Sequence, residues 1–393
     1  MRILIATDTY YPHVNGVSYF TQRLAVELSL KGHTVAVIAP GEKFKHTLQN
    51  HKKIAFYGMP SIPIFISKFR FSLPLFIKKK IKDIIEEFNP QIIHLQGHII
   101  IGRLVLDVAR SKKIPVIATN HFMPENLVHF LPVPEKIREQ IKKYAWRDLG
   151  KVFKEVQMIT TPTKSAANLI KDCLPQTIQV ISCGIDLKKF NPKNKQLSFY
   201  KKYHLPQKPS LLYVGRLDKE KNVDFVLRAV AQALKSIDFH FIIAGIGVEL
   251  KKLKRLAEKL SIQEKITFLG FVPDKDLSAL YCVADCFVIA GIAELQSIVT
   301  MEAMASGLPI LAVNAVALPE LVHDGKNGFL FELNNPINLA EKIITILSNK
   351  KLQQSMAKNS LKIISSHNIE KTISAFEKLY QQLINNNSTN EKI

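Results

Sequence analysis

AGIAELQSIVTMEAMASGLP, residues 290–309, is the stretch that decides the fold of this chain. The apolar run CFVIA just before it predicts a buried strand, which ends in a short loop that carries Glu294. A helix that carries Glu302 is then expected to open at Ser297, Ile298 and Val299. The free N–H groups and positive dipole at such a helix start suit a diphosphate, and carboxylates on either side can accept hydrogen bonds from hydroxyls. The pattern predicts a site for a sugar, a diphosphate and a ribose.

The surroundings of Glu302 favour this interpretation over the alternative of two ordinary surface glutamates. Charged residues mostly lie at surfaces, so the alternative holds for glutamates in general. Apolar residues, however, occupy nearly every position around this helix: Ile298, Val299, Met301, Ala303, Met304 and Ala305. A helix that is apolar all round is buried, and a buried carboxylate is costly unless it has partners. Glu302 is therefore expected to be buried and paired.

A series of strands and helices leads up to this stretch. The strand LLYVG ends at Gly215, and a basic loop with Arg216 and Lys221 follows it, ahead of a helix over 223–233. Both cations can reach a diphosphate from such a junction, although a solvated basic loop is the alternative. The next strands are FHFIIAG, which ends at Gly245, and ITFLGFV, which ends at Phe271 and Val272.

The first 190 residues alternate short apolar strands with helices in the same way. Strands are predicted over Arg2–Ala6, His33–Ala39, Ile92–Leu95, Pro115–Thr119, Met158–Thr161 and Gln179–Ile181, with a helix over Val17–Lys31. This alternation predicts βαβ units and a doubly wound parallel sheet, in which ligands bind beyond the carboxyl ends of the strands. A chain of 393 residues is too long for one ordinary core. The polar segment NPKNKQLSFYKKYHLPQKP after Phe190 is interpreted as the linker between domains 1–190 and 191–365.

Two residues of the first half follow strands at the edge where ligands are expected. Gly16 lies where a helix begins, so backbone N–H groups can approach a phosphate or an acceptor there, although a plain turn is the alternative. The same loop lacks G-x-G-x-x-G, which argues against a dinucleotide-dependent dehydrogenase. His121 directly follows IPVIATN and can exchange a hydrogen bond with a sugar hydroxyl; an ordinary loop histidine is the alternative. His98 is a weaker candidate, and His94 is expected inside the core.

Charge is the most informative feature of the composition. The net charge is +21, and residues 1–190 carry +14 of it, which points to anionic lipid or nucleic acid as a partner. Nucleic acid is not expected, because no recognised binding module is present. Segments Ile64–Phe88 and Pro132–Val156 combine basic with apolar residues, as an interfacial membrane anchor requires; helices with solvated lysines are the alternative. The residues expected to contact the membrane or acceptor are Lys68, Arg70, Lys78, Lys79, Lys80, Lys142, Lys143 and Trp146.

Several of these motifs resemble those of retaining glycosyltransferases of family 4, which have the GT-B fold. The E-x7-E pattern of Glu294 and Glu302 resembles the family signature, as do EAMASGLP and ALPELVHDGKNGFLF after it. Gly215, Arg216 and Lys221 match its G-R-x-x-x-x-K motif, and TNHF matches its histidine loop. The loop before Gly16 resembles its Y-x-P-x-x-G-G motif, with Asn15 in place of the first glycine. The chain departs from the family at Ala290-Gly291, where Pro-Ser is usual, and at Ser297, where glycine is usual.

The resemblance implies an α/β protein with two Rossmann-like doubly wound domains that face each other across a cleft. The domain 191–365 would hold the nucleotide sugar and the domain 1–190 the acceptor, while a helix in 366–393 would return to the first domain. Transfer would keep the anomeric configuration and would need no metal.

The resemblance also implies roles for individual residues. The diphosphate would be held by Arg216, Lys221 and the helix start at Ser297, Ile298 and Val299. Glu294 would orient the sugar, Glu302 the ribose, and His121 a sugar hydroxyl. The remaining nucleotide-sugar contacts would come from Gly16, Gly215 and Gly245, with Phe271 and Val272 at the base.

The acceptor is inferred from two stretches, ELQSIVTMEAMASGLP and TNHFMPENLVHFLP, which look most like those of bacterial diacylglycerol glucosyltransferases that use UDP-glucose. This implies transfer of a hexose to a lipid such as 1,2-diacylglycerol by a peripheral protein on the cytoplasmic face of the cell membrane. No apolar run approaches the roughly 18 residues that span a bilayer. Two alternatives remain: a mannosyl- or other hexosyltransferase acting on phosphatidylinositol or a polysaccharide or lipopolysaccharide, and a nucleotide-sugar-binding protein without turnover.

Overall fold

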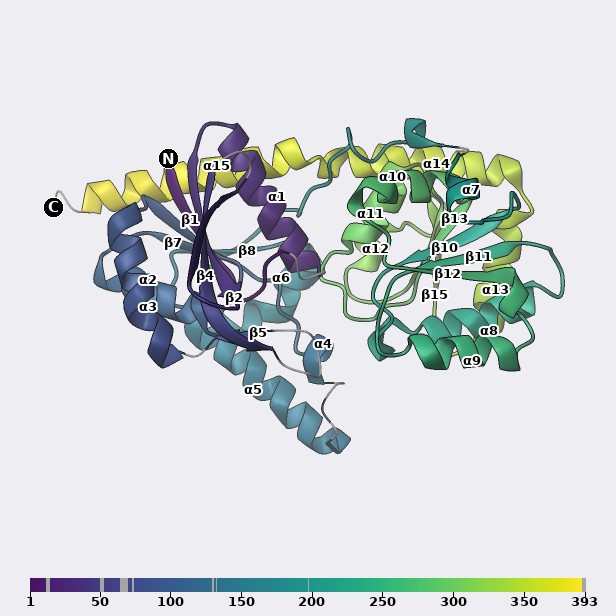
Figure 1. The fold of residues 1–393 in the computed structure, drawn as a ribbon, viewed down its shortest axis with the longest axis horizontal. Helices are drawn as coiled ribbons and strands as arrows, with labels where there is room; N and C mark the ends of the chain where they lie inside the picture. Colours follow the sequence, from purple (N-terminus) through teal and green to yellow (C-terminus); the bar gives the residue numbers. More distant parts are fainter. Residues whose placement is uncertain are drawn as a thin grey trace. The chain divides into compact units, whose positions relative to one another are not determined.

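The protein consists of two compact units, which are described separately (Figure 1). The computed structural model describes residues 1–11, 15–49, 53–63, 70–72, 74–128, 131, 133–196 and 198–390. The first unit comprises Met1–Cys183 and Glu370–Ile393, and the second Gly184–Ile369. The divisions therefore lie at 183/184 and 369/370 rather than at the predicted 190/191 and 365/366. Phe190 stacks edge-on with Tyr281 at 6.0 Å, so the segment before the predicted linker packs in the second unit.

The first unit is built on a nine-stranded sheet in the order β3-β4-β2-β1-β6-β7-β8-β9, with β5 paired to β4. Every pair along β4-β2-β1-β6-β7-β8-β9 is parallel, whereas β3 and β5 run antiparallel to β4. The strands are β1 (Arg2–Ala6), β2 (Thr34–Gly41), β3 (Lys45–Gln49), β4 (Ile54–Pro63), β5 (Arg70–Ser72), β6 (Ile92–Leu95), β7 (Val116–Thr119), β8 (Met158–Thr161) and β9 (Ile178–Val180).

The predicted strands of this half are confirmed within a residue or two, but β3, β4 and β5 were not predicted. The central strands form because they are continuous apolar runs, which can be buried on both faces of a parallel sheet. The strand β3, with the sequence KHTLQ, is mostly polar and lies at the edge of the sheet. A solvated edge strand needs no apolar pattern, so its sequence carried no signal.

Helices cover this sheet: α1 (Gly16–Leu30), α2 (Pro74–Phe88), α3 (Ile101–Ser111), α4 (Glu125–Val128), α5 (Glu135–Phe153) and α6 (Lys164–Ile170), with a short turn η1 (Lys171–Cys173). The helix α2 shows why such segments pack on the sheet. Its buried residues Ile77, Ile81, Ile84 and Ile85 share one face and join the core of the unit. Asn15 caps α1 by accepting a hydrogen bond from the backbone N–H of Ser18 at 2.9 Å.

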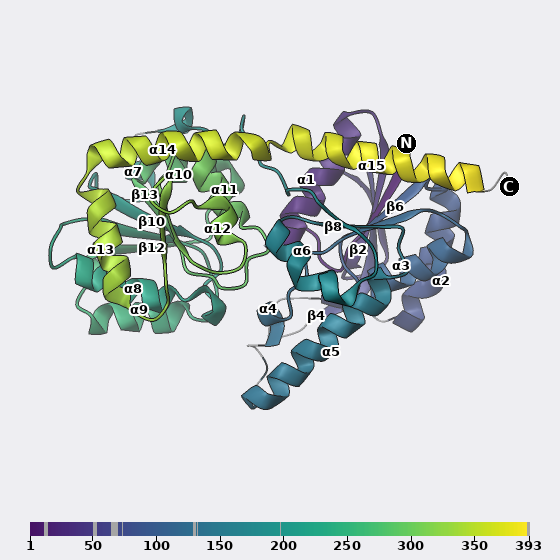
Figure 2. The ribbon, with the colours of Figure 1, turned by 180° about the vertical axis from the view of Figure 1, so that it is seen from behind.

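The last helix, α15 (Ile369–Asn390), packs on the first unit (Figure 2). In the sequence, the whole second unit separates this helix from the rest of the first unit. Phe376 and Tyr380 are fully buried, and the ring of Phe376 contacts Phe20 and His94. Glu377 accepts a hydrogen bond from His33 at 2.8 Å and pairs with Lys31. The terminal helix thus contributes both apolar and charged contacts to the first unit.

The second unit is a six-stranded parallel sheet in the order β12-β11-β10-β13-β14-β15. The strands are β10 (Ser210–Val214), β11 (His240–Ala244), β12 (Ile266–Gly270), β13 (Cys286–Ile289), β14 (Ile310–Val313) and β15 (Gly328–Phe331). The order reverses between β10 and β13, which is the place where doubly wound sheets bind ligands.

The helices of the second unit are α7 (Ser198–Lys202), α8 (Val223–Ala233), α9 (Leu250–Lys259), α10 (Asp274–Val283), α11 (Ile298–Ala305), α12 (Leu318–Leu321), α13 (Pro336–Leu347) and α14 (Lys350–Ile364). Short turns are η2 (Pro192–Asn194), η3 (Lys219–Lys221), η4 (Gln263–Lys265) and η5 (Ser365–His367). Both units are therefore doubly wound α/β structures, as predicted. Among the described residues, no helix is long and apolar enough to cross a membrane.

Candidate functional site

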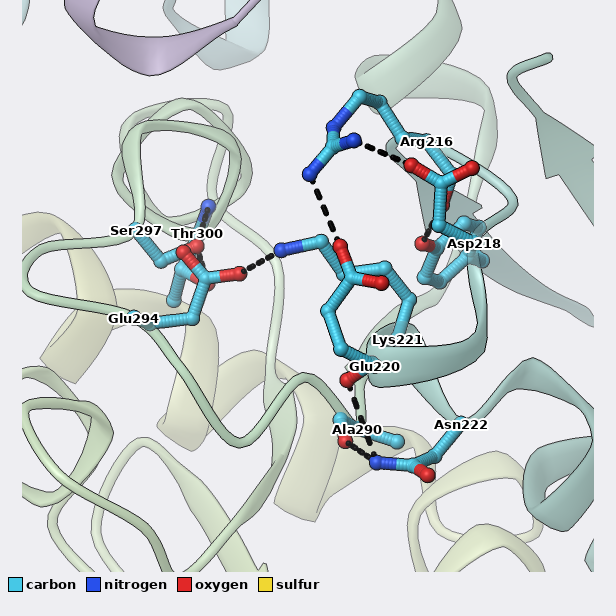
Figure 3. Close-up of polar contacts among 10 residues, drawn as sticks. Arg216, Asp218, Glu220, Lys221, Asn222, Ala290, Glu294, Ser297 and Thr300 are labelled. Atoms are coloured by element: carbon cyan, nitrogen blue, oxygen red, sulfur yellow. Dashed lines mark hydrogen bonds and ion pairs between the residues drawn. The ribbon is translucent and has the colours of Figure 1, made fainter. Parts of the chain in front are cut away.

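The loops after β10 and β13 meet at the switch point of the second sheet and bring Lys221 and Glu294 together (Figure 3). Nζ of Lys221 lies 2.7 Å from Oε1 of Glu294, and both side chains keep a small exposed fraction. Asn222 follows in a left-handed conformation, with φ of 50°, and donates from its side chain to the carbonyl of Ala290 at 2.9 Å. The end of one loop is thereby tied to the start of the other.

Arg216 is held in the same loop by two acidic residues. Its guanidinium pairs with Asp218 and donates to Oε1 of Glu220 at 2.8 Å, as Figure 3 shows. Both carboxylates are nearly buried, whereas the side chain of Arg216 is 29% exposed. The buried hydroxyl of Tyr213 donates to the carbonyl of Arg216 at 2.7 Å, which fixes the backbone of the loop. The planar guanidinium group of Arg216 is therefore oriented by the protein and is still accessible to an anion.

Glycines allow three neighbouring loops to approach closely at this edge. A Cβ on Gly245 would lie 1.8 Å from the carbonyl oxygen of Gly215, and one on Gly247 would lie 2.3 Å from that of Leu217. Backbone hydrogen bonds run from Gly215 to Ala244 and from Gly245 to Gly270, at 3.0 and 2.8 Å. The packing of the loops thus requires Gly245 and Gly247. A Cβ on Gly215 would lie 2.9 Å from the hydroxyl of Tyr213, so Gly215 and Gly245, the two predicted site residues, each have a structural reason to be glycine.

The loop after β12 carries the two residues that were predicted to contact a nucleotide base. Phe271 is half exposed, whereas Val272 is buried. Both residues directly follow β12, the edge strand beside β11, so they lie beyond the carboxyl end of the sheet. Their position is compatible with the predicted contact, and the contact itself stays a prediction.

The helix α11 begins after Ser297, as predicted. The hydroxyl oxygen of Ser297 accepts hydrogen bonds from Oγ1 and the backbone N–H of Thr300, at 2.8 and 3.4 Å. Ser297 is therefore the N-cap of the helix, a role that a glycine at this position would fill without a side chain. The N–H groups of Ile298 and Val299 belong to the first turn, where no intrahelical acceptor is available, so they remain suited to an anion.

Glu302 is buried on this helix, and the prediction that it has a partner is confirmed. The hydroxyl of Tyr281, on α10, donates to Oε2 of Glu302 at 2.9 Å. Burial and the adjacent carboxylate raise the pKa of Tyr281 well above its usual value, so its proton stays on the phenol and in the hydrogen bond. Contact of Glu302 with a ribose stays a prediction.

In the first unit, His121 lies directly after β7 and is held from two sides. Its Nε2 is 2.8 Å from Oε1 of Gln96, and its ring lies 5.0 Å from that of Phe20. Burial lowers the pKa of His121 to about 3, so the imidazole is neutral at physiological pH. Gly16 begins α1, as predicted, after the loop that follows β1, which is separated from β7 by β6 in the sheet.

The other two histidines of this edge are buried. His94 is inside the core, as predicted. His98 packs edge-on against Phe122 and Phe153 at 4.8 and 5.9 Å, and burial lowers its pKa to about 4. Its aromatic surroundings make His98 a packing residue in the structure.

The residues predicted to meet a membrane differ in their surroundings. Lys78, Lys79 and Lys80 are exposed on α2, as is Lys143 on α5, and Phe76 near the start of α2 is 69% exposed. Lys68 lies outside the described residues.

The other three have partners within the first unit. Arg70 donates to the hydroxyl and the carbonyl of Ser61 at 2.8 and 2.7 Å, which ties β5 to β4. Lys142 pairs with Glu139 at 2.6 Å, and Trp146 is partly buried and contacts Phe122 edge-on at 6.2 Å. These three side chains therefore already have partners within the first unit, and Arg70 and Trp146 contribute to its packing.

Four residues that organise these sites were not among the predicted site residues. They are Asp218 and Glu220, which hold Arg216, Asn222, which joins two loops, and Gln96, which contacts His121. The alternating charges of RLDKEK were the available signal for Asp218 and Glu220. Acidic residues beside a predicted anion site are unfavourable unless a neighbouring cation pairs with them.

Comparison with known proteins bears on both units. Residues 14–189 match the family model described as Glycosyltransferase Family 4, and residues 195–363 match Glycosyl transferases group 1. An alpha-monoglucosyldiacylglycerol synthase of Streptococcus pneumoniae is 31% identical over 96% of this chain and 85% of the relative. The enzyme of the same name from Acholeplasma laidlawii is 28% identical over the whole of both chains. A GDP-mannose-dependent alpha-mannosyltransferase of Corynebacterium glutamicum is 25% identical over 85% of this chain and 77% of the relative.

Solved structures agree on the fold. A sucrose-phosphate synthase from Thermosynechococcus elongatus superposes with a TM-score of 0.80 at 18% identity, covering 97% of this chain and 98% of the other. HepE of Anabaena, solved in complex with UDP-glucose, superposes with a TM-score of 0.76 at 17% identity, covering 97% and 100%. Together with the switch-point geometry, these matches show that the chain belongs to glycosyltransferase family 4 and is a hexosyltransferase of the GT-B fold.

Proposed function

We propose that this hexosyltransferase moves glucose from UDP-glucose to 1,2-diacylglycerol at an anionic membrane surface, on the cytoplasmic side, with retention of configuration. The observation that carries the lipid acceptor is the match, over nearly the whole chain, to two relatives named as alpha-monoglucosyldiacylglycerol synthases. A basic stripe on the first unit supports the membrane surface. The second candidate is a mannosyl donor, which the relative named as a GDP-mannose-dependent mannosyltransferase favours.

In this proposal the second unit holds the donor by its diphosphate. Arg216, Lys221 and the N–H groups at the start of α11 face the charge that builds on the leaving group, where fixed positive charge contributes most to rate. Glu294 orients the sugar and Lys221 together, Glu302 meets the ribose, and the first unit offers His121 to a sugar hydroxyl. The reaction proceeds without a metal, because cationic side chains and helix N–H groups neutralise the diphosphate.

The basic stripe lies on α5 and its C-cap and is defined by Lys136, Lys143, Arg147, Lys151 and Lys154. All five side chains are exposed, and their spacings of seven, four, four and three residues place them on one face over a length of about 27 Å. The buried residues of α5 lie only near its end, from Leu149 onward, and Figure 1 shows the first half of the helix extending away from the sheet of the first unit. Ile137 and Tyr144 add exposed apolar surface beside the stripe. A long basic face with apolar neighbours fits an anionic lipid surface.

The donor and acceptor are tested by transfer from a panel of UDP- and GDP-sugars to phosphatidylcholine vesicles, with and without diacylglycerol or phosphatidylinositol. Mass spectrometry of the lipids is expected to show a hexosyl diacylglycerol with UDP-glucose alone. A hexosyl phosphatidylinositol formed from GDP-mannose would favour the second candidate. Release of UDP without formation of any glycolipid would indicate that the acceptor is a water-soluble glycan.

Charge reversal on the basic stripe is expected to weaken membrane binding by at least about a hundredfold. The change is Lys136→Glu, Lys143→Glu and Arg147→Glu together, and each basic residue near an anionic surface contributes about 1 kcal/mol. The measurement is co-sedimentation with vesicles that contain phosphatidylglycerol, compared with vesicles of phosphatidylcholine alone.

A matched control exists in the second unit. Lys351, Lys358 and Lys362 on α14 are exposed with the same spacing of seven and four residues, so their reversal changes the net charge equally. Vesicle binding should survive in this control. Equal loss in both triple variants would mean that net charge, rather than the stripe, drives the association.

A further inference from the structure

A buried chain of polar groups in the first unit leads from the terminal helix to His121. The hydroxyl of Tyr380, on α15, lies 2.6 Å from Nδ1 of His94. Nε2 of His94 lies 2.9 Å from Nε2 of Gln96, whose Oε1 is 2.8 Å from Nε2 of His121. Tyr380, His94 and Gln96 are each at least 98% buried, so water does not compete for these hydrogen bonds.

The orientation of the Gln96 amide determines where each proton lies. An amide nitrogen only donates, so Nε2 of His94 accepts and Nδ1 of His94 carries the proton, which it donates to Tyr380. The hydroxyl of Thr119 lies 2.6 Å from the same nitrogen and 2.6 Å from the hydroxyl of Thr160. An amide oxygen only accepts, so His121 donates from Nε2 and its Nδ1 is left as an acceptor.

These assignments are coupled to one another. If the amide of Gln96 turned over, its oxygen would face an unprotonated nitrogen of His94 and its NH₂ group would face the proton of His121. That repulsion disappears only if both histidines change tautomer and Tyr380 becomes a donor. The backbone of Gln96 is anchored to β1 by a hydrogen bond from its N–H to the carbonyl of Ala6 at 2.8 Å. The tautomers of His94 and His121 are thus coupled through Gln96, and the hydroxyl of Tyr380 ends the chain at Nδ1 of His94.

We propose that Gln96 is a positioning residue that, through His94 and Tyr380, holds His121 as the Nε2–H tautomer and so presents Nδ1 as an acceptor for a substrate hydroxyl. The part that concerns substrate rests on the proposed function. The tautomer itself does not, because it is a property of the free protein. Burial lowers the pKa values of His94 and His121 to about 3, so both rings remain neutral and the choice of tautomer matters at working pH.

The test is NMR of the full chain with isotope-labelled histidine at pH 8, where the ring nitrogen shifts report the tautomer, and the His121 signals are assigned by their loss in His121→Asn. The wild type is expected to show His121 protonated at Nε2. Gln96→Met, which has a similar shape but neither donor nor acceptor, is expected to give a mixture of both tautomers. Gln96→Glu keeps an acceptor next to His121, so it is expected to restore the Nε2–H form.

A second variant tests the coupling from a distance. Tyr380→Phe removes the acceptor for Nδ1 of His94, and it is expected to shift His121 toward the Nδ1–H tautomer. Ser374→Ala is the control, because Ser374 lies on the same helix and interacts with Lys31 at 3.4 Å, outside the chain of polar groups. His121 should keep its tautomer in this control.

Turnover provides the readout that depends on the proposed function. Gln96→Met is expected to lower kcat about tenfold, the value of one hydrogen bond, with the Kd for UDP unchanged and with kcat restored in Gln96→Glu. A wild-type His121 protonated at Nδ1, or a tautomer that is the same in Gln96→Met and Tyr380→Phe as in the wild type, would overturn the proposal. A shifted tautomer with no transfer from any donor would leave the positioning role intact and contradict the proposed function instead.

Discussion

Replacing Glu294 by glutamine is expected to lower kcat by about a hundred- to a thousandfold, while the affinity for the nucleotide stays within about tenfold of the wild type. The amide has the shape of the carboxylate but no charge, so the 2.7 Å ion pair with Lys221 is lost and the lysine is no longer fixed at the leaving diphosphate. Nucleotide binding relies on other groups as well and should change less. Steady-state kinetics and calorimetric titration of UDP separate the two effects.

A comparable ion pair elsewhere in the second unit supplies the control. Glu249 pairs with Lys252, also at 2.7 Å, in the first turn of α9. Glu249→Gln should leave kcat unchanged, because the Lys252 side chain is 73% exposed and an ion pair with a solvated partner contributes little. Turnover in Glu294→Gln at the level of this control would remove Glu294 from the mechanism.

The second large effect is expected at Arg216. Arg216→Ala should lower kcat by about a hundredfold or more, because a fixed cation at the leaving group acts mainly in the transition state. Arg216→Lys keeps the charge but loses the fork that engages Asp218 and Glu220 at the same time, so it should recover only part of the rate. Kinetics with saturating donor distinguish loss of rate from loss of binding.

Lys219 provides the control for Arg216, since it lies in the same loop, carries the same charge and is exposed. Lys219→Ala should keep nearly full kcat. Thermal unfolding of each variant is needed beside the kinetics, because removal of Arg216 leaves two nearly buried carboxylates without its charge. A kcat for Arg216→Ala equal to that of Lys219→Ala, in a folded protein, would contradict the role of Arg216.

Much of the fold could be predicted, because continuous apolar runs separated by helical segments have few other solutions. The strands β1, β2, β6, β7 and β8 follow from this pattern. The strands β3 and β5 could not be predicted, since short edge strands bury little and need no apolar pattern. The long strand β4 was also missed, as its sequence IAFYGMPSIP contains glycine and two prolines, which weaken a strand prediction.

The site was predictable as a set of residues but not as a set of contacts. Glu294 and Lys221 were each placed beside a diphosphate, yet their direct pairing depends on two strands becoming neighbours across the switch point. Asp218 and Glu220 have the sequence of an ordinary charged surface loop, and only the structure shows that they are buried against Arg216. Gln96 and Tyr380 are far apart in sequence, so nothing local indicated that both contact His94.

The packing of α15 on the first unit has a consequence for how the chain becomes folded. During synthesis, residues 1–183 leave the ribosome long before Phe376 and Tyr380. Phe20 and His94 therefore lack their contacts with these two residues until α15 has been made. The second unit is one continuous segment, Gly184–Ile369, and its sheet can be completed first. The earlier-made half is therefore expected to mature last, and its immature core is the surface that a chaperone would meet on the nascent protein.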